Sequence, residues 1–379
     1  MSENAPIIDT CVTPFWRSEV EPHLWMSEPW ASKRHMPGVL RQMYTAPTGI
    51  APYGEYLEEA RPDDDASALP GSSVSKILAK LDRDNARVGV LSPLTRGPQP
   101  DIDMATELCA ATNQWLANTW LDAPDSGDRF LGTIRVNPSD PDKAVAEIEK
   151  WADHPHMVQI GVPLDAWRPY GHRNYFPIWK AAAELKLPVV IHADGGAAAN
   201  YKPTMAGYPT KHIEYASQEN ISGLYHLASF ILEGVVDRLP DLRVVFGDGA
   251  FDLLMPFLWR MDGDWGISRH ETPWVSDTPS EHLDHFRFRT SRFEAPTDQA
   301  SEKAWLEVSR AEELLIYGSN YPHWSSMSPA DLPSGLSSEG RERILSRNAA
   351  DLYEPRLRAL GNTAALNAIG VQAVTGNQP

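Results

Sequence analysis

The stretch Pro188-Val-Val-Ile-His192 is a short apolar run that ends on an imidazole. Two later runs have the same form. Arg243-Val-Val-Phe-Gly-Asp248 ends on a carboxylate, and Leu314-Leu-Ile-Tyr-Gly-Ser-Asn320 ends on an amide. Such runs are typical of strands that are buried on both faces of a parallel sheet. In a parallel α/β barrel all strand ends of this kind meet at one face, where active sites lie. We therefore expect the three polar side chains to meet there.

The first apolar run, Ile7-Ile-Asp9-Thr-Cys11-Val-Thr13, brings a thiol and a hydroxyl to the same face. A bound metal would be expected to have imidazoles and carboxylates around it instead. The pattern therefore indicates a metal-hydrolase centre from which ligands have been removed.

Strand-like and helix-like segments alternate along the chain. The predicted strands cover 7–13, 88–91, 130–136, 157–160, 188–192, 243–247, 286–293 and 314–317. The predicted helices cover 73–85, 103–120, 141–152, 175–185, 221–239, 252–262, 301–308 and 339–352. A doubly wound sheet is the rival arrangement, but no G-x-G-x-x-G follows the first strand and no P-loop is present. The alternation predicts an α/β protein with a (β/α)8 TIM-type barrel.

The barrel is expected to occupy residues 1–355 as one domain. After the first strand comes a long insertion, residues 14–71, which we expect to pack over the barrel mouth because it is rich in aromatic residues. These aromatics are Phe15, Trp16, Trp25, Trp30, Tyr44 and Tyr53. Residues 356–379 are small and polar with a weak pattern, so we expect a C-terminal tail.

Composition narrows the class of partner. The net charge is −17, with 34 basic and 51 acidic residues, which argues against nucleic acid or an anionic membrane surface. Two cysteines give no disulfide framework and fit a reducing compartment. No secretory signal pattern and no apolar run of about 18 residues is found. We expect a soluble cytoplasmic protein with a small-molecule substrate, and the apolar helix near 220–239 is compatible with a homodimer.

Several segments resemble one enzyme family in their order and spacing. They include Pro188-Val-Val-Ile-His192, Leu258-Trp-Arg-Met-Asp262, Tyr317-Gly-Ser-Asn-Tyr-Pro-His-Trp324 and Ile344-Leu-Ser-Arg-Asn-Ala. Through them the chain resembles the amidohydrolase superfamily, in its amidohydrolase-2 branch related to aminocarboxymuconate-semialdehyde decarboxylase. The resemblance runs from Ile7 to about Tyr353. It implies a (β/α)8 barrel and a divalent metal, usually zinc, held by the first, fifth, sixth and eighth strands. It also implies hydrolysis of C–N or C–O bonds, or non-oxidative decarboxylation of small aromatic or unsaturated acids.

The chain departs from the family pattern at most ligand positions. On the first strand Asp9 is kept, but the family's two ligands become Cys11 and Thr13. On the fifth strand His192 is kept.

The later strands continue this departure. Asp248 stands where relatives carry His or Glu, and Asn320 replaces the Asp before Tyr-Pro. Thr13 and Asn320 carry no charge to offset dehydration of a metal. Our expectation is that no cofactor is bound. The alternative is zinc held by Cys11, His192 and Asp248.

Within this site we assign proton transfer to His192 and Asp248. Asn320 and His323 are expected to orient the substrate. An amide cannot titrate, so Asn320 is given no role in proton transfer. The expected substrate-binding residues are Trp16, Trp324 and Thr13. Each has a structural alternative: Cys11 and the tryptophans are also compatible with simple packing in the core, and His192 with a structural barrel histidine.

The leading hypothesis is a lyase or hydrolase of amidohydrolase type. It would decarboxylate or hydrolyse a compact aromatic or unsaturated carboxylic acid derivative through a metal-independent His/Asp mechanism. A metal-free rearrangement in a specialised pathway is also compatible. The alternatives are a zinc-dependent hydrolase and an inactive homologue that binds a ligand or a partner protein.

Overall fold

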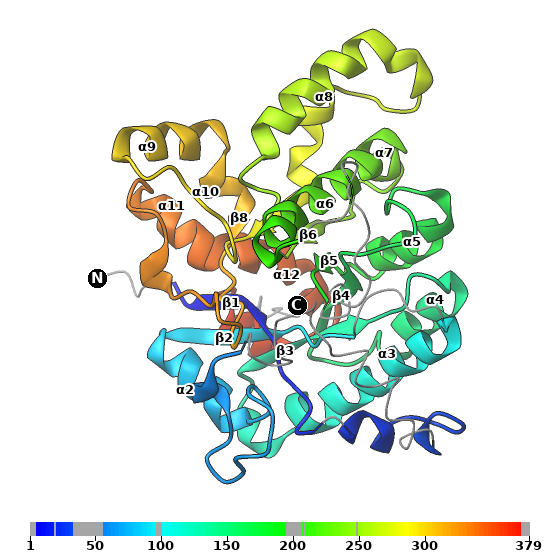
Figure 1. Cartoon of the computed structure of the whole chain (residues 1–379), viewed down its shortest axis with the longest axis vertical. Helices are drawn as coiled ribbons and strands as arrows, with labels where there is room; N and C mark the ends of the chain where they lie inside the picture. The colour runs from blue at the N-terminus through cyan, green and yellow to red at the C-terminus, as the bar shows by residue number, and fades with distance from the viewer. Residues whose placement is uncertain are drawn as a thin grey trace, which may run out of the picture.

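The computed structural model describes residues 5–18, 20–32, 56–95, 101–194, 207, 210–247 and 249–372. Its centre is an eight-stranded parallel sheet whose spatial order, β1 to β8, follows the chain. The strands are β1 (Ile7–Val12), β2 (Ala86–Leu91), β3 (Phe130–Arg135), β4 (Met157–Pro163), β5 (Val189–His192), β6 (Val244–Phe246), β7 (Phe286–Arg289) and β8 (Leu315–Ile316). Figure 1 shows the helices placed around these strands.

The last strand lies against the first. Thr10 N donates to Tyr317 O at 2.9 Å, and further along Thr13 N donates to Tyr321 O at 2.8 Å. The sheet is therefore a (β/α)8 barrel, which confirms the fold prediction. All eight strands fall where the apolar runs predict them, because a parallel strand in a barrel is covered on both faces.

The larger helices are α2 (Val74–Arg83), α3 (Ile102–Leu116), α4 (Pro141–Lys150), α5 (Phe176–Glu184), α6 (His212–Leu232), α8 (Leu254–Ser268), α9 (Gln299–Val308) and α12 (Asn348–Ala359). The short α-helices in the described part of the chain are α7 (Val235–Arg238), α10 (Ala311–Leu314), α11 (Ser338–Glu342) and α13 (Thr363–Ala368). Several start at side-chain caps: Ser73, Asp101, Asp140 and Asp298 each accept a hydrogen bond from a backbone N–H of the first turn.

Helix α6 begins at His212, earlier than the start at residue 221 that the apolar pattern predicts. The added turns are polar, so they carry no helical periodicity in apolar residues. Their start is fixed instead by Glu214, whose carboxylate accepts hydrogen bonds from Thr210 N and Lys211 N at 2.8 Å. The predicted single helix ends at Leu232, and α7 follows Gly234, which has a φ of 65°.

Helices α12 and α13 belong to the barrel's interior core. Leu357, Leu366 and Ile369 are buried in one cluster with inward-facing strand residues such as Ile8 and Val190. The expected boundary at residue 355 lies inside α12, and the expected tail contains α13. The apolar pattern of this segment is weak because its six-residue helix buries only a few apolar side chains.

The described ends of the 14–71 insertion are attached to the segment after β8. Leu57 N donates to Pro322 O at 2.8 Å, and Tyr56 forms a backbone bridge with His323. The Phe15 ring lies edge-on to Tyr56, with ring centroids 4.5 Å apart. Two of the insertion's predicted aromatics, Tyr44 and Tyr53, lie outside the described residues.

None of the helices in the described ranges is both long and apolar enough to cross a membrane.

Candidate active site

Three polar side chains meet at the carboxyl ends of the strands. Cys11 Sγ lies 3.5 Å from His192 Nε2 and 3.8 Å from Asn320 Oδ1. The three residues come from β1, β5 and the segment after β8, and each is at most 5 % exposed. Three of the side chains that the sequence places at this face are therefore brought together.

The backbone around Asn320 fixes its place beside β1. Asn320 N donates to Cys11 O at 2.9 Å. Asn320 has a φ of 58°, in the left-handed region that Asn tolerates better than most residues. Next to it, Gly318 is packed so closely that a Cβ there would lie 2.9 Å from Cys11 Cβ. A side chain at residue 318 would therefore disturb Cys11.

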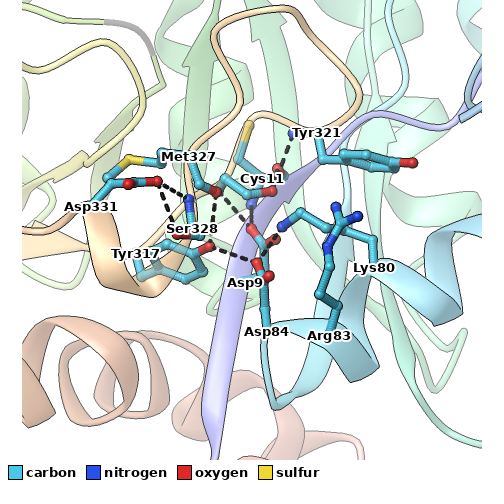
Figure 2. A network of polar contacts seen from close by, with 12 residues as sticks. Asp9, Cys11, Lys80, Arg83, Asp84, Tyr317, Tyr321, Met327, Ser328 and Asp331 are labelled. Carbon is cyan, nitrogen blue, oxygen red and sulfur yellow. Dashed lines mark hydrogen bonds and ion pairs between the residues drawn. The ribbon is translucent and has the colours of Figure 1, made fainter. Parts of the chain in front are cut away.

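Asp9 holds this arrangement from below the site. Its Oδ1 accepts hydrogen bonds from Cys11 N at 3.1 Å and Ser319 N at 2.9 Å (Figure 2). Complete burial raises the pKa of Asp9 above its usual range, against the opposing charge of Lys80. The carboxylate kept from the family pattern thus ties β1 to the segment after β8.

Helix α2 and the segment after β8 enclose Asp9. Lys80 forms a buried ion pair with Asp84, and Figure 2 shows this pair beside Asp9. Tyr317 Oη lies 3.2 Å from Asp84 Oδ2 and 3.1 Å from Met327 O. These contacts join helix α2 to the end of β8 and the segment after it.

The orientation of His192 follows from its second ring nitrogen. Nδ1 lies 2.5 Å from Ala193 O. A carbonyl oxygen only accepts, so Nδ1 carries the proton and donates. In the neutral ring Nε2 then has its lone pair directed toward Cys11 Sγ. This is the state in which imidazole binds a metal or accepts a proton.

Of the other predicted residues, one is not described and the rest make the following contacts. Asp248 is not among the described residues. His323 Nδ1 lies 2.7 Å from Ser325 Oγ, and neighbouring Trp324 is 57 % exposed. Thr13 is buried and bonded through its backbone to Tyr321. The Trp16 ring packs at 4.2 Å from the Trp115 ring of α3, in the core outside the barrel wall.

The sequence analysis missed a buried ion pair near His192. Arg135 Nη2 lies 2.5 Å from Asp194 Oδ2, and both side chains are at most 2 % exposed. Asp194 also accepts from Thr95 N at 2.6 Å and from Thr95 Oγ1 at 2.9 Å. The network joins the ends of β2, β3 and β5. An arginine that ends an apolar strand, as in Phe130-Leu-Gly-Thr-Ile-Arg135, was the available signal.

A family model described as amidohydrolase matches residues 29–354, and the chain belongs to this family, as the sequence resemblance predicts. A search of curated proteins found no match.

Solved structures share the fold at low identity. An amidohydrolase from Mycobacterium avium subsp. paratuberculosis K-10 has 18% identity and a TM-score of 0.66, covering 93% of this chain and 100% of its own. The 5-carboxyvanillate decarboxylase of Novosphingobium aromaticivorans, with manganese, has 17% identity and a TM-score of 0.64 over 93% and 97%. Dihydroxybenzoic acid decarboxylase from Polaromonas sp. JS666, with manganese and an inhibitor, has 16% identity and a TM-score of 0.60 over 92% and 97%.

These manganese complexes contradict the expectation that no cofactor is bound. That expectation considered only the charge that is lost at Thr13 and Asn320. A neutral oxygen, such as the amide oxygen of Asn320, can also bind a metal.

The converging side chains of this chain fit a divalent ion. Donors about 2.0–2.3 Å from one tetrahedral ion lie roughly 3.5 Å apart, close to the 3.5 and 3.8 Å found around Cys11 Sγ. Within the described ranges no three His, Cys, Asp or Glu side chains form such a group, because the third donor here is the Asn320 amide oxygen.

Proposed function

We propose that this protein is a metal-dependent lyase that decarboxylates a compact aromatic or unsaturated carboxylic acid at the carboxyl end of its barrel. The observation that carries the proposal is the convergence of Cys11 Sγ, His192 Nε2 and Asn320 Oδ1. Two structurally similar members of the family, each decarboxylating a substituted benzoic acid by name, support the choice of reaction.

In this proposal Cys11, His192 and Asn320 hold the metal. A divalent metal at that point would supply Lewis-acid polarisation of a substrate oxygen. The chain's own contribution is to keep the three donors in place. Ala193 O fixes the His192 ring, and the Asp9 carboxylate fixes the backbone of Cys11 and Ser319. Preorganised donors need no rearrangement when charge develops in the substrate.

Loss of carbon dioxide requires a proton to be delivered to the ring carbon. Asn320 cannot titrate, and His192 Nδ1 is occupied by Ala193 O. We assign the proton donor to Asp248, which follows β6. His323 and Trp324, on the segment after β8, are assigned to orient the ring of the substrate. The burial of the three donors would remove water from the substrate's carboxylate, which favours decarboxylation.

The test uses the purified protein loaded with manganese and a panel of hydroxylated benzoic acids, including 5-carboxyvanillate and 2,6-dihydroxybenzoate. We expect release of carbon dioxide from at least one acid, loss of turnover with a chelator and recovery when manganese is returned. A parallel panel holds the methyl esters and amides of the same acids. Turnover of esters or amides without carbon dioxide would identify a hydrolase and reject the lyase proposal.

A further inference from the structure

A fully buried arginine lies inside the barrel without a charged partner among the described residues. Arg289 ends β7 and is 0 % exposed. Its Nη2 donates to Ser92 Oγ at 3.3 Å. Within the described part of the chain, its Nε and Nη1 have no hydrogen-bond partner.

Arg289 differs in this respect from the other buried basic residues described. Arg135 is paired with Asp194, and Lys80 with Asp84. Arg356 donates to the carbonyl oxygens of Met157, Leu185 and Ala152. Of these four residues, only Arg289 has buried donor atoms for which the described part of the chain offers no partner.

The surroundings of Arg289 are polar but neutral. Gln159 Nε2 donates to Thr133 Oγ1 at 2.7 Å, and Thr133 Oγ1 lies 3.3 Å from Ser92 Oγ. Tyr353, which rises from α12, gives its hydroxyl hydrogen to Gln159 Oε1 at 2.8 Å. Burial raises the pKa of Tyr353 against the opposing charge and hydrogen bond of Arg289, so its phenol is a neutral neighbour of the guanidinium. None of these groups balances the guanidinium.

Arg289 is adjacent to the candidate active site. A Cβ on Gly318 would lie 2.9 Å from Cys11 Cβ and 3.4 Å from Arg289 Cβ. Cys11 and Arg289 therefore flank the same glycine, on β1 and β7.

We infer that Arg289 binds an anionic group of the ligand, namely a carboxylate on a compact aromatic acid. An unpaired cation in the protein interior is costly, and an anion with hydrogen-bond acceptors removes that cost. Shielding from water strengthens the attraction. The choice of aromatic acids rests on the proposed function; the anion itself is inferred from the burial of Arg289 and from its two donors without a described partner.

The experiment compares benzoate with benzamide, which has nearly the same shape and no charge. Binding to the full chain is measured by calorimetry for wild type, Arg289→Met and Arg289→Lys. We expect wild type to prefer benzoate by at least about 10-fold, the size of one charge-assisted hydrogen bond. Arg289→Met should abolish the preference, and Arg289→Lys should retain part of it.

Arg287→Met is the control on the same strand, because Arg287 lies nearer the amino end of β7 and its Nη1 donates to Asp284 O and Phe286 O. It should keep the preference. Absence of a benzoate preference in wild type, including failure to bind either probe, overturns the inference without any variant. A folded Arg289→Met that still prefers benzoate overturns it as well, and if that variant does not fold, Arg289→Gln replaces it.

The two proposals fail separately. If no acid releases carbon dioxide but the benzoate preference depends on Arg289, the lyase proposal is rejected and the anion site stands. If carbon dioxide is released while Arg289→Met leaves the preference unchanged, the lyase proposal stands and the anion site is rejected.

Discussion

Cys11 Sγ and His192 Nε2 lie 3.5 Å apart although 181 residues separate them in the chain. Their side chains leave β1 and β5, on opposite parts of an eight-stranded barrel. Side chains at the carboxyl ends of the strands point toward the mouth of the barrel, which brings such distant residues together. The Ala193 carbonyl, which holds Nδ1 of His192, then directs the second nitrogen to the thiol.

His192→Asn should lower turnover by about 100- to 10,000-fold, because the imidazole either holds the metal or moves a proton. The midpoint of thermal unfolding should change little. The matched control is His226→Asn, where the ring joins Leu164 O at 2.7 Å and Tyr170 N at 3.1 Å. That change should instead lower stability by about 1–3 kcal/mol. Near-normal turnover of a folded His192→Asn would remove His192 from the site.

Asn320→Asp should increase the affinity for manganese, because a carboxylate adds the charge that the amide lacks. A ligand that binds only the folded state raises the unfolding midpoint by mass action. The measurement is the thermal midpoint with and without manganese for wild type, Asn320→Asp and His192→Asn. We expect the largest shift for Asn320→Asp and the smallest for His192→Asn. Equal shifts in all three would place the metal elsewhere.

Asp194→Leu should destabilise the fold by about 3–5 kcal/mol, because Arg135 would remain buried without its partner. The double variant Arg135→Leu with Asp194→Leu should be less destabilised than Asp194→Leu alone. Denaturant unfolding measures both. The control pair is Arg260 and Asp264 on α8, whose side chains are 82% and 64% exposed, and Asp264→Leu should cost under about 1 kcal/mol. Similar losses at both pairs would contradict the role of burial.

Leu366→Ala should lower stability by about 2–5 kcal/mol, because the side chain is 3 % exposed beneath the barrel. Leu24→Ala, at a residue that is 74 % exposed, should change stability by less than about 0.5 kcal/mol. Unfolding in urea compares the two. A negligible effect at Leu366 would show that α13 is dispensable.

Asp252 should make stability depend on pH. Burial raises the pKa of this carboxyl from 3.8 to about 6 in the folded protein. The stability it contributes is therefore complete below about pH 4 and is lost as the pH rises through about 6. Asp252→Asn should remove this decline, so the stability difference between variant and wild type should grow across that window. A constant difference from pH 4 to 7 would contradict the shift.

The sequence alone determined the barrel and the strand-end positions of Cys11, His192 and Asn320. It could do so because strands covered on both faces must be apolar, and a polar residue at such a strand's carboxyl end must lie at the mouth. These are local rules, readable within about ten residues.

Only the tertiary structure decided what surrounds those residues. The sequence shows only that Asp9 is kept from the family pattern, whereas the structure shows that its carboxylate accepts hydrogen bonds from the backbone of Cys11 and Ser319. The pairing of Arg135 with Asp194, and the absence of any described partner for two donors of Arg289, depend on segments far apart in the chain. Burial and charge balance are properties of the assembled interior, because each side chain's environment is supplied by other strands.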